Sequence, residues 1–128
     1  MREIKFKGYY KGTNGIWRED PDFIDVNGKC FDKNWEDIEE DKNYFLVQYT
    51  GVKDVNETEI FEGDILRIVS NFELRKDVQN QVVTCEEGCF GTDEWALFEL
   101  LRNRNRKGEE QTFEVIGNIY LNPELLEE

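Results

Sequence analysis

The chain has 128 residues, 29 of them acidic and 16 basic, which gives a net charge of −13. This length suits one ordinary domain, or a small barrel with an appendage. A chain of this length can bury roughly two thirds of the surface that it exposes when unfolded, which is enough for a core without disulfides or metals. The negative charge disfavours nucleic-acid binding, which depends on neutralising phosphates. The sequence has no long apolar run and no apolar signal region at its start, so we expect a cytoplasmic protein that does not span a membrane.

The first fifty residues favour two β-hairpins. Residues 4–10 alternate apolar and basic side chains before two tyrosines, and the Asn14-Gly15 pair that follows favours a tight turn. Residues 23–31 repeat this pattern around a second Asn-Gly pair. Residues 36–41 hold five acidic side chains, which would repel one another along a helix, so we favour a loop there over a short helical turn.

The middle of the chain gives the clearest alternation of strands and turns. Residues 45–49 are apolar and aromatic, which is typical of a strand. Asp54 and Asn56 can hydrogen-bond their own backbone and favour a turn. Gly63 can adopt a positive φ at little cost and so favours a second, tighter turn before the strand predicted over residues 64–69.

The second half of the chain predicts more strands separated by polar stretches. Strands are expected at residues 81–85 and 113–120, with Gly117 marking a bulge, and one more strand within residues 90–101. A short helix is expected from Pro123, with Asn122 as its cap and with Leu125 and Leu126 packed on the sheet. The two long polar stretches, predicted as loops, are residues 70–80 and 102–110.

Several short motifs follow one another in a specific order, at residues 2–6, 48–51 with Asp54, 59–65, 86–91, 113–120 and 122–126. This order resembles that of the YopX-like family of small proteins encoded by phages and prophages. At Asn56-Glu57 the chain departs from the Asn-Gly turn that is usual in the family.

The resemblance implies a mainly β protein with a small SH3-like β-barrel portion, made in a bacterial host, and it implies no catalytic residue. The expected organisation is an N-terminal β-hairpin region at residues 1–50, followed by the barrel with a short C-terminal helix at residues 51–128.

The residue types of common catalytic and metal sites are missing or too few. The chain has no histidine, which removes the commonest general base and metal ligand, and no glycine-rich phosphate-binding motif. Cys30, Cys85 and Cys89 fall short of the four ligands of a structural zinc site, so we expect reduced thiols. The stretch from Asp54 to Glu59 lacks the glycine of a calcium loop. We therefore expect no enzyme, no catalytic residue, no bound metal and no cofactor.

Two classes of function remain, and the fold alone does not decide between them. The first, which we favour, is a binding or assembly protein that self-associates and contacts a host or phage protein through sheet edges and exposed aromatic side chains. The second is a nucleic-acid-linked role, either as an acidic mimic of DNA or as a weak binder through a basic loop. The candidate contact residues are Tyr9, Tyr10 and Trp17, together with the basic cluster Arg102, Arg104, Arg106 and Lys107.

Overall fold

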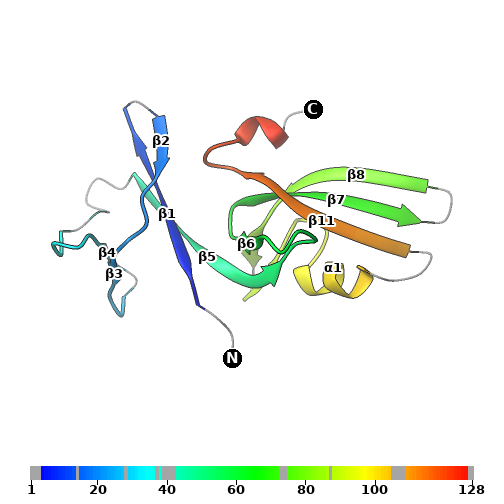
Figure 1. Cartoon of the computed structure of the whole chain (residues 1–128), viewed down its shortest axis with the longest axis horizontal. Helices are drawn as coiled ribbons and strands as arrows, with labels where there is room; N and C mark the ends of the chain where they lie inside the picture. Colours follow the sequence, from blue (N-terminus) through cyan, green and yellow to red (C-terminus); the bar gives the residue numbers. More distant parts are fainter. Residues whose placement is uncertain are drawn as a thin grey trace.

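The computed structural model describes residues 4–13, 15–27, 29–36, 38, 43–72, 75–86, 88–104 and 109–126. The molecule is elongated, with the small N-terminal strands at one end and a three-stranded sheet at the other (Figure 1). Strands dominate and the helical segments are short, which confirms the predicted fold class. The acidic stretch at 36–41, predicted as a loop, lies mostly outside the described residues.

The first sheet contains four strands in the order β2-β1-β5-β6. Gly12 pairs with Gly15 at the tip of the first hairpin, and Gly15 has a φ of 120°, so the predicted Asn-Gly hairpin is confirmed. A register shift between Tyr49 and Lys53 bends the strand that joins the two ends of the molecule. The four strands are β1 (Phe6–Gly12), β2 (Gly15–Arg18), β5 (Tyr44–Lys53) and β6 (Glu59–Phe61).

A second, two-stranded hairpin connects β2 to β5. It pairs β3 (Phe23–Ile24) with β4 (Cys30–Phe31), which confirms the second predicted hairpin. The Asp25 carboxylate organises the turn, because its Oδ1 accepts hydrogen bonds from the backbone N–H groups of Asn27 and Lys29.

The second sheet contains three antiparallel strands in the order β11-β7-β8. They are β7 (Asp64–Phe72), β8 (Arg75–Val82) and β11 (Glu109–Asn118). A register shift between Val115 and Gly117 interrupts the β11–β7 pairing, which confirms the predicted bulge.

The polar stretch at 70–80 was predicted as a loop, and this prediction is wrong. β7 continues to Phe72 and β8 begins at Arg75, so most of the stretch forms a hairpin. The misleading signal was polarity, but an antiparallel strand at a sheet edge can leave its side chains in water and needs no apolar face.

A short hairpin and a helix pack against the three-stranded sheet β11-β7-β8. The single strand predicted within residues 90–101 is wrong: β10 (Cys89–Gly91) pairs with β9 (Thr84–Glu86), and α1 (Leu97–Asn103) follows. Leu97 and Leu100 are three residues apart on one buried face of α1, while Glu99 Oε1 accepts the N–H of Ala96 and closes the first turn.

The predicted C-terminal helix is confirmed as the 3-10 helix η1 (Pro123–Leu126). Its predicted cap is not formed by the Asn122 side chain, whose Oδ1 accepts the N–H of Asn118 at 3.3 Å instead. Leu125 lies over Gly117, where a Cβ would come within 2.8 Å of the Leu125 Cδ1, whereas Leu126 is 41% exposed.

Two hydrophobic clusters meet at β6. The larger one lies between the second sheet and α1, and the smaller one lies between β1, β5 and β6. β6 contributes Ile60 to the larger cluster and Phe61 to the smaller one. The domain boundary expected between residues 50 and 51 falls inside β5. The buried members are Ile60, Leu66, Ile68, Val83, Leu97, Leu100 and Phe113 in one cluster, and Tyr9, Val47, Tyr49 and Phe61 in the other.

Candidate interaction surfaces

Tyr10 and Trp17 line a shallow groove at the first hairpin. They face each other across β1 and β2, with ring centroids 4.9 Å apart, and Trp17 is 45% exposed. A Cβ at Gly12 would come within 2.5 Å of the Trp17 ring, so the missing side chain lets the indole lie against the backbone. The groove has a volume of about 520 Å³, and Lys11 and Asn43 extend its lining.

Tyr9, the third aromatic side chain predicted to be exposed, is buried. It is 4% exposed, its ring stacks on Tyr120 at 4.9 Å, and its Oη accepts a hydrogen bond from Asn118 Nδ2. Successive side chains of a strand point to opposite faces, so Tyr9 is buried while its neighbour Tyr10 is only half-buried. Burial, with the nearby Asp64 carboxylate, raises the pKa of the Tyr9 phenol.

Asp64 is the buried carboxyl group beside this aromatic stack. It begins β7 directly after the Gly63 turn, is 6% exposed, and its Oδ2 accepts the N–H of Phe61 at 2.8 Å. Loss of water around the carboxylate raises the pKa of Asp64 to about 6, although the Phe61 N–H and Lys7 oppose this shift. Its hydrogen bond to Phe61 holds the turn together.

Asp54 makes the turn between β5 and β6 and anchors it to the second sheet. It is 1% exposed, and its Oδ1 accepts the N–H groups of Asn56 and Thr58. Its Oδ2 accepts the N–H of Val115 at the β11 bulge, at 2.8 Å. Both carboxylate oxygens are therefore engaged by the backbone, which leaves the structural turn as the role of this segment.

The same loop geometry occurs three times within the described residues, and sequence reasoning missed the repeat. In the segments that begin at Asp25, Asp32 and Asp54, the aspartate Oδ1 accepts the N–H groups two and four residues later. The signal was an Asp-X-Asn sequence at each place. The fourth position adopts a left-handed backbone at Trp35 and Glu57, with φ values of 60° and 63°.

The predicted basic cluster is only partly described. Arg102 is exposed in the last turn of α1, while the Arg104 guanidinium lies 5.4 Å from the centroid of the Phe113 ring. Arg106 and Lys107 lie outside the described residues.

The three cysteines are free thiols. Cys30 is buried in β4, whereas Cys85 and Cys89 are exposed on the β9–β10 hairpin. Cys85 pairs with Phe90 and Cys89 with Glu86, so alternation along the strands directs the two exposed thiols to opposite faces of the hairpin.

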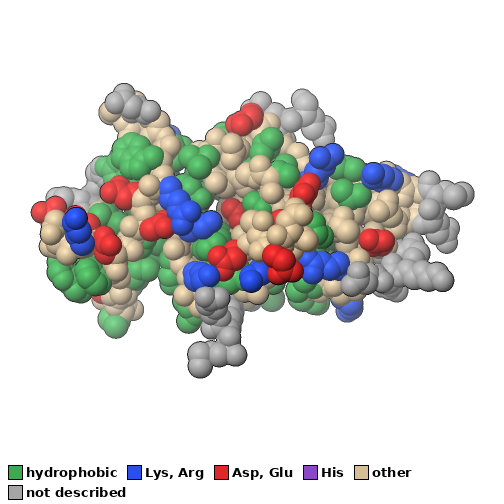
Figure 2. Space-filling view, in the orientation of Figure 1, with side chains coloured by type: hydrophobic (Ala, Val, Ile, Leu, Met, Phe, Trp, Pro, Cys, Tyr) green, Lys and Arg blue, Asp and Glu red, His purple; other side chains and the backbone are tan. Residues whose placement is uncertain are grey.

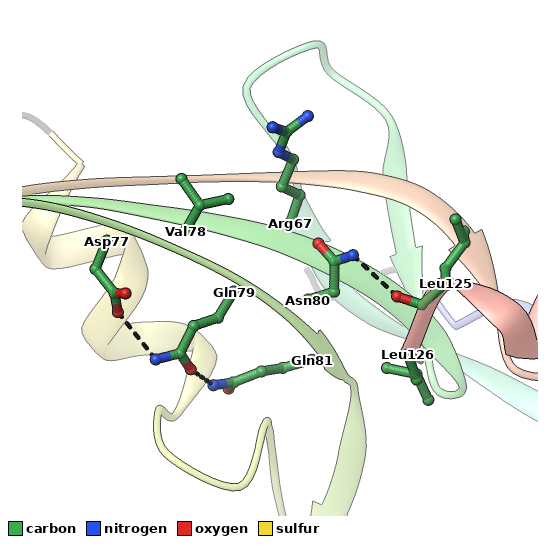
Figure 3. A pocket seen from close by; sticks show the side chains of 8 residues that line it. All are labelled: Arg67, Asp77, Val78, Gln79, Asn80, Gln81, Leu125 and Leu126. Carbon is green, nitrogen blue, oxygen red and sulfur yellow. Dashed lines mark hydrogen bonds between the residues drawn. The ribbon is translucent and has the colours of Figure 1, made fainter. Parts of the chain in front are cut away.

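The free edge of β8 carries a groove with a volume of about 600 Å³ (Figure 3). Within the described residues, β8 pairs with β7 alone. The lining includes side chains from both faces of β8, so the groove follows the edge of the strand. Asp77, Gln79 and Gln81 are linked by side-chain hydrogen bonds on one face, and Asn80 Nδ2 donates to the Leu125 carbonyl on the other. The full lining is Arg67, Asp77, Val78, Gln79, Asn80, Gln81, Leu125 and Leu126.

Figure 2 shows hydrophobic side chains gathered at the end that carries β1 to β4. Neither helix in the described part of the chain is long and apolar enough to cross a membrane.

Comparison with known proteins identifies one family and a solved relative. The pattern of the family described as "YopX protein" matches residues 8–127, nearly the whole chain. The crystal structure of protein EF1440 from Enterococcus faecalis is similar over 99% of this chain and 100% of that one, with 25% sequence identity and a TM-score of 0.64. No curated protein matches the sequence.

Proposed function

This chain belongs to the YopX family, and we propose that it is a non-enzymatic binding or assembly protein that self-associates through the open edge of β8. In line with the family resemblance, we place it among phage or prophage proteins that act in the cytoplasm of a bacterial host. The proposal rests on an eight-residue edge strand, β8, whose side chains line a groove.

The free edge offers backbone groups to a further strand. Val83 N–H donates to the Asp64 carbonyl, and the Val83 carbonyl accepts the Gly63 N–H. Because backbone groups alternate in direction along an antiparallel strand, those of Gln79 point to β7 and those of Val78 and Asn80 point away from it. Unpaired groups of this kind are a template for strand addition.

A second copy of the chain is the partner that we propose for this edge. Two copies related by a two-fold axis can pair their β8 strands antiparallel, which joins two three-stranded sheets into one. In the register that pairs Val78 with Asn80 of the other copy, Lys76 faces Val82 and Asp77 faces Gln81, so no like charges are opposed. The net charge of −13 on each copy opposes contact, so added salt should strengthen the association.

The test is a proline that blocks the edge without disturbing the sheet. Proline is tolerated on an edge strand where its nitrogen faces solvent, so we expect Val78→Pro to fold and to be monomeric. Val78→Thr keeps the N–H group and should retain the wild-type association. Light scattering over a range of protein and salt concentrations measures the mass, and circular dichroism checks the fold. A wild-type protein that is monomeric throughout, or an oligomer unaffected by Val78→Pro, would refute the proposal.

The alternative, a nucleic-acid-linked role, has less support. Direct binding requires basic side chains free to reach phosphates, and the Arg104 guanidinium already lies over Phe113. Binding of DNA that weakens steeply with salt and is lost on neutralising Arg102 and Arg104 would favour this role.

A further inference from the structure

Phe23 and Trp35 form an exposed aromatic stack at the end of the molecule far from β8. Their ring centroids are 4.2 Å apart and their planes differ by 2°. Phe31, the cross-strand partner of Phe23, packs against the same indole at a tilt of 50°. The three rings come from β3, β4 and the following Asp32 loop, so two short strands and one loop position them.

Trp35 is the most exposed of the three aromatic residues. Phe23 stacks on one face of the indole, yet Trp35 as a residue is 63% exposed. Phe23 is itself 39% exposed, and Ile24 next to it is 37% exposed. Large apolar side chains that gather on a surface mark contact sites more often than isolated ones do.

The backbone holds this indole in place at a cost. Trp35 has a φ of 60°, a left-handed conformation that is unfavourable for a bulky residue. The Asp32 side chain enforces it by accepting the N–H groups of Asn34 and Glu36. Glycine would fit the position without strain, so the backbone conformation of the loop does not explain the tryptophan.

Acidic residues outnumber basic ones in the sequence around the stack. Residues 19–36 contain six acidic and two basic side chains. Asp22 is next to Phe23 and its N–H donates to the Phe31 carbonyl, while Glu36 follows Trp35. The ammonium group of Lys29 already lies 5.7 Å from the centroid of the Phe31 ring, so this cluster accepts a cation over an aromatic face.

We infer that the Phe23–Trp35 stack binds a basic, arginine-containing peptide segment of a partner protein. A guanidinium group stacks on the open face of Trp35 and the flanking carboxylates select for positive charge. The negative surroundings oppose the phosphates of nucleic acid and of anionic lipid. This surface is separate from β8 and does not depend on self-association.

The test is a nuclear magnetic resonance titration of the ¹⁵N-labelled full chain with a synthetic peptide of alternating arginine and glycine. The chain has three tryptophans, and the peak missing in Trp35→Gly identifies the Trp35 indole N–H. We expect this peak to shift saturably at low salt and the affinity to fall as salt is added. A peptide of alternating glutamate and glycine should leave it unchanged.

Matched variants separate the ring from the loop. Trp35→Gly removes the ring from a left-handed position and should weaken binding roughly ten-fold, as measured by the backbone amide peaks of Phe23 and Ile24, which this variant retains. Glu57→Gly makes the same backbone change in the Asp54 loop and should retain full affinity.

Three results would overturn the inference. The first is an unmoved Trp35 peak at millimolar arginine peptide and low salt. The second is an equal response to the glutamate peptide. The third is a stronger Trp35 response to single-stranded DNA or to anionic lipid vesicles, which would assign the stack to bases or to a membrane surface.

Discussion

Asp64 carries a carboxyl group that the fold removes from water, and its charge therefore opposes folding. With a pKa of about 6 in the folded protein and an ordinary value near 3.8, the folded state retains a proton that the unfolded state loses between these values. The stabilising contribution of this group is complete below about pH 3.8 and is lost as the pH rises through 6.

Asp64→Asn should remove this pH dependence. The amide oxygen can still accept the Phe61 N–H, and the variant carries no buried charge at neutral pH. We compare the free energy of unfolding of the variant with that of the wild type. This difference should shift in favour of the variant by on the order of 2–3 kcal/mol between pH 4 and pH 7. Urea unfolding of both proteins across this range measures it.

Asp20→Asn is the control for Asp64→Asn. The Arg18 guanidinium holds the pKa of Asp20 below its usual value, so this variant should lose stability above pH 4. Parallel pH profiles for Asp64→Asn and wild type would contradict the prediction.

At the scale of single elements, the Asp54 loop shows how one side chain connects two sheets. Its carboxylate accepts hydrogen bonds from the backbone N–H groups of Asn56, Thr58 and Val115, which water would otherwise have to accept. The equivalent Asp25 loop makes two of these bonds and lies at the surface.

We expect Asp54→Ala to reduce the free energy of unfolding by about 3–5 kcal/mol, because three partly buried N–H groups lose the buried carboxylate that accepts them. Asp25→Ala should cost about 1 kcal/mol, because water reaches the freed groups. Chemical denaturation of the two variants measures both changes. Equal costs would show that the loop, and not its connection to β11, determines the loss.

The elements that could be predicted from the sequence are those with their own local signal. Asn-Gly pairs identified both N-terminal hairpins, and Gly117 identified the bulge. β8 could not be identified by apolar alternation, because Val78 is the sole aliphatic side chain between Arg75 and Gln81. It is a strand because β7 beside it supplies the pairing partner.

The candidate surfaces were predictable to different degrees. The groove at Tyr10 and Trp17 contains two of the predicted residues, and their role in partner contact stays a prediction. The Phe23–Trp35 stack depends on a loop whose geometry is set by Asp32, and no spacing in the sequence places those two rings together.

For the whole molecule, β6 determines whether the two ends unfold separately. It places Ile60 in one hydrophobic cluster and Phe61 in the other, one residue apart. Because unpairing this strand exposes both clusters, we expect one cooperative transition for residues 1–50 and 51–128 together.

Indole signals provide a probe at each end, since Trp17 lies on the first hairpin and Trp95 packs against the larger cluster. Their loss with rising urea should coincide, with equal midpoints and slopes. Two separate midpoints would instead support independent domains. Phe61→Leu, which weakens the smaller cluster, should lower both midpoints together.

The contact of Tyr9 with Tyr120 and Asn118 affects how the chain folds during its synthesis on the ribosome. Tyr9 and Asn118 are 109 residues apart in the chain. At roughly 5–20 residues per second, the first hairpin waits about 5–20 s before its partners are synthesised. During that time the apolar side of β1 lacks its final cover. We therefore expect chaperones to have access to the nascent N-terminal strands until Asn118 and Tyr120 have been synthesised.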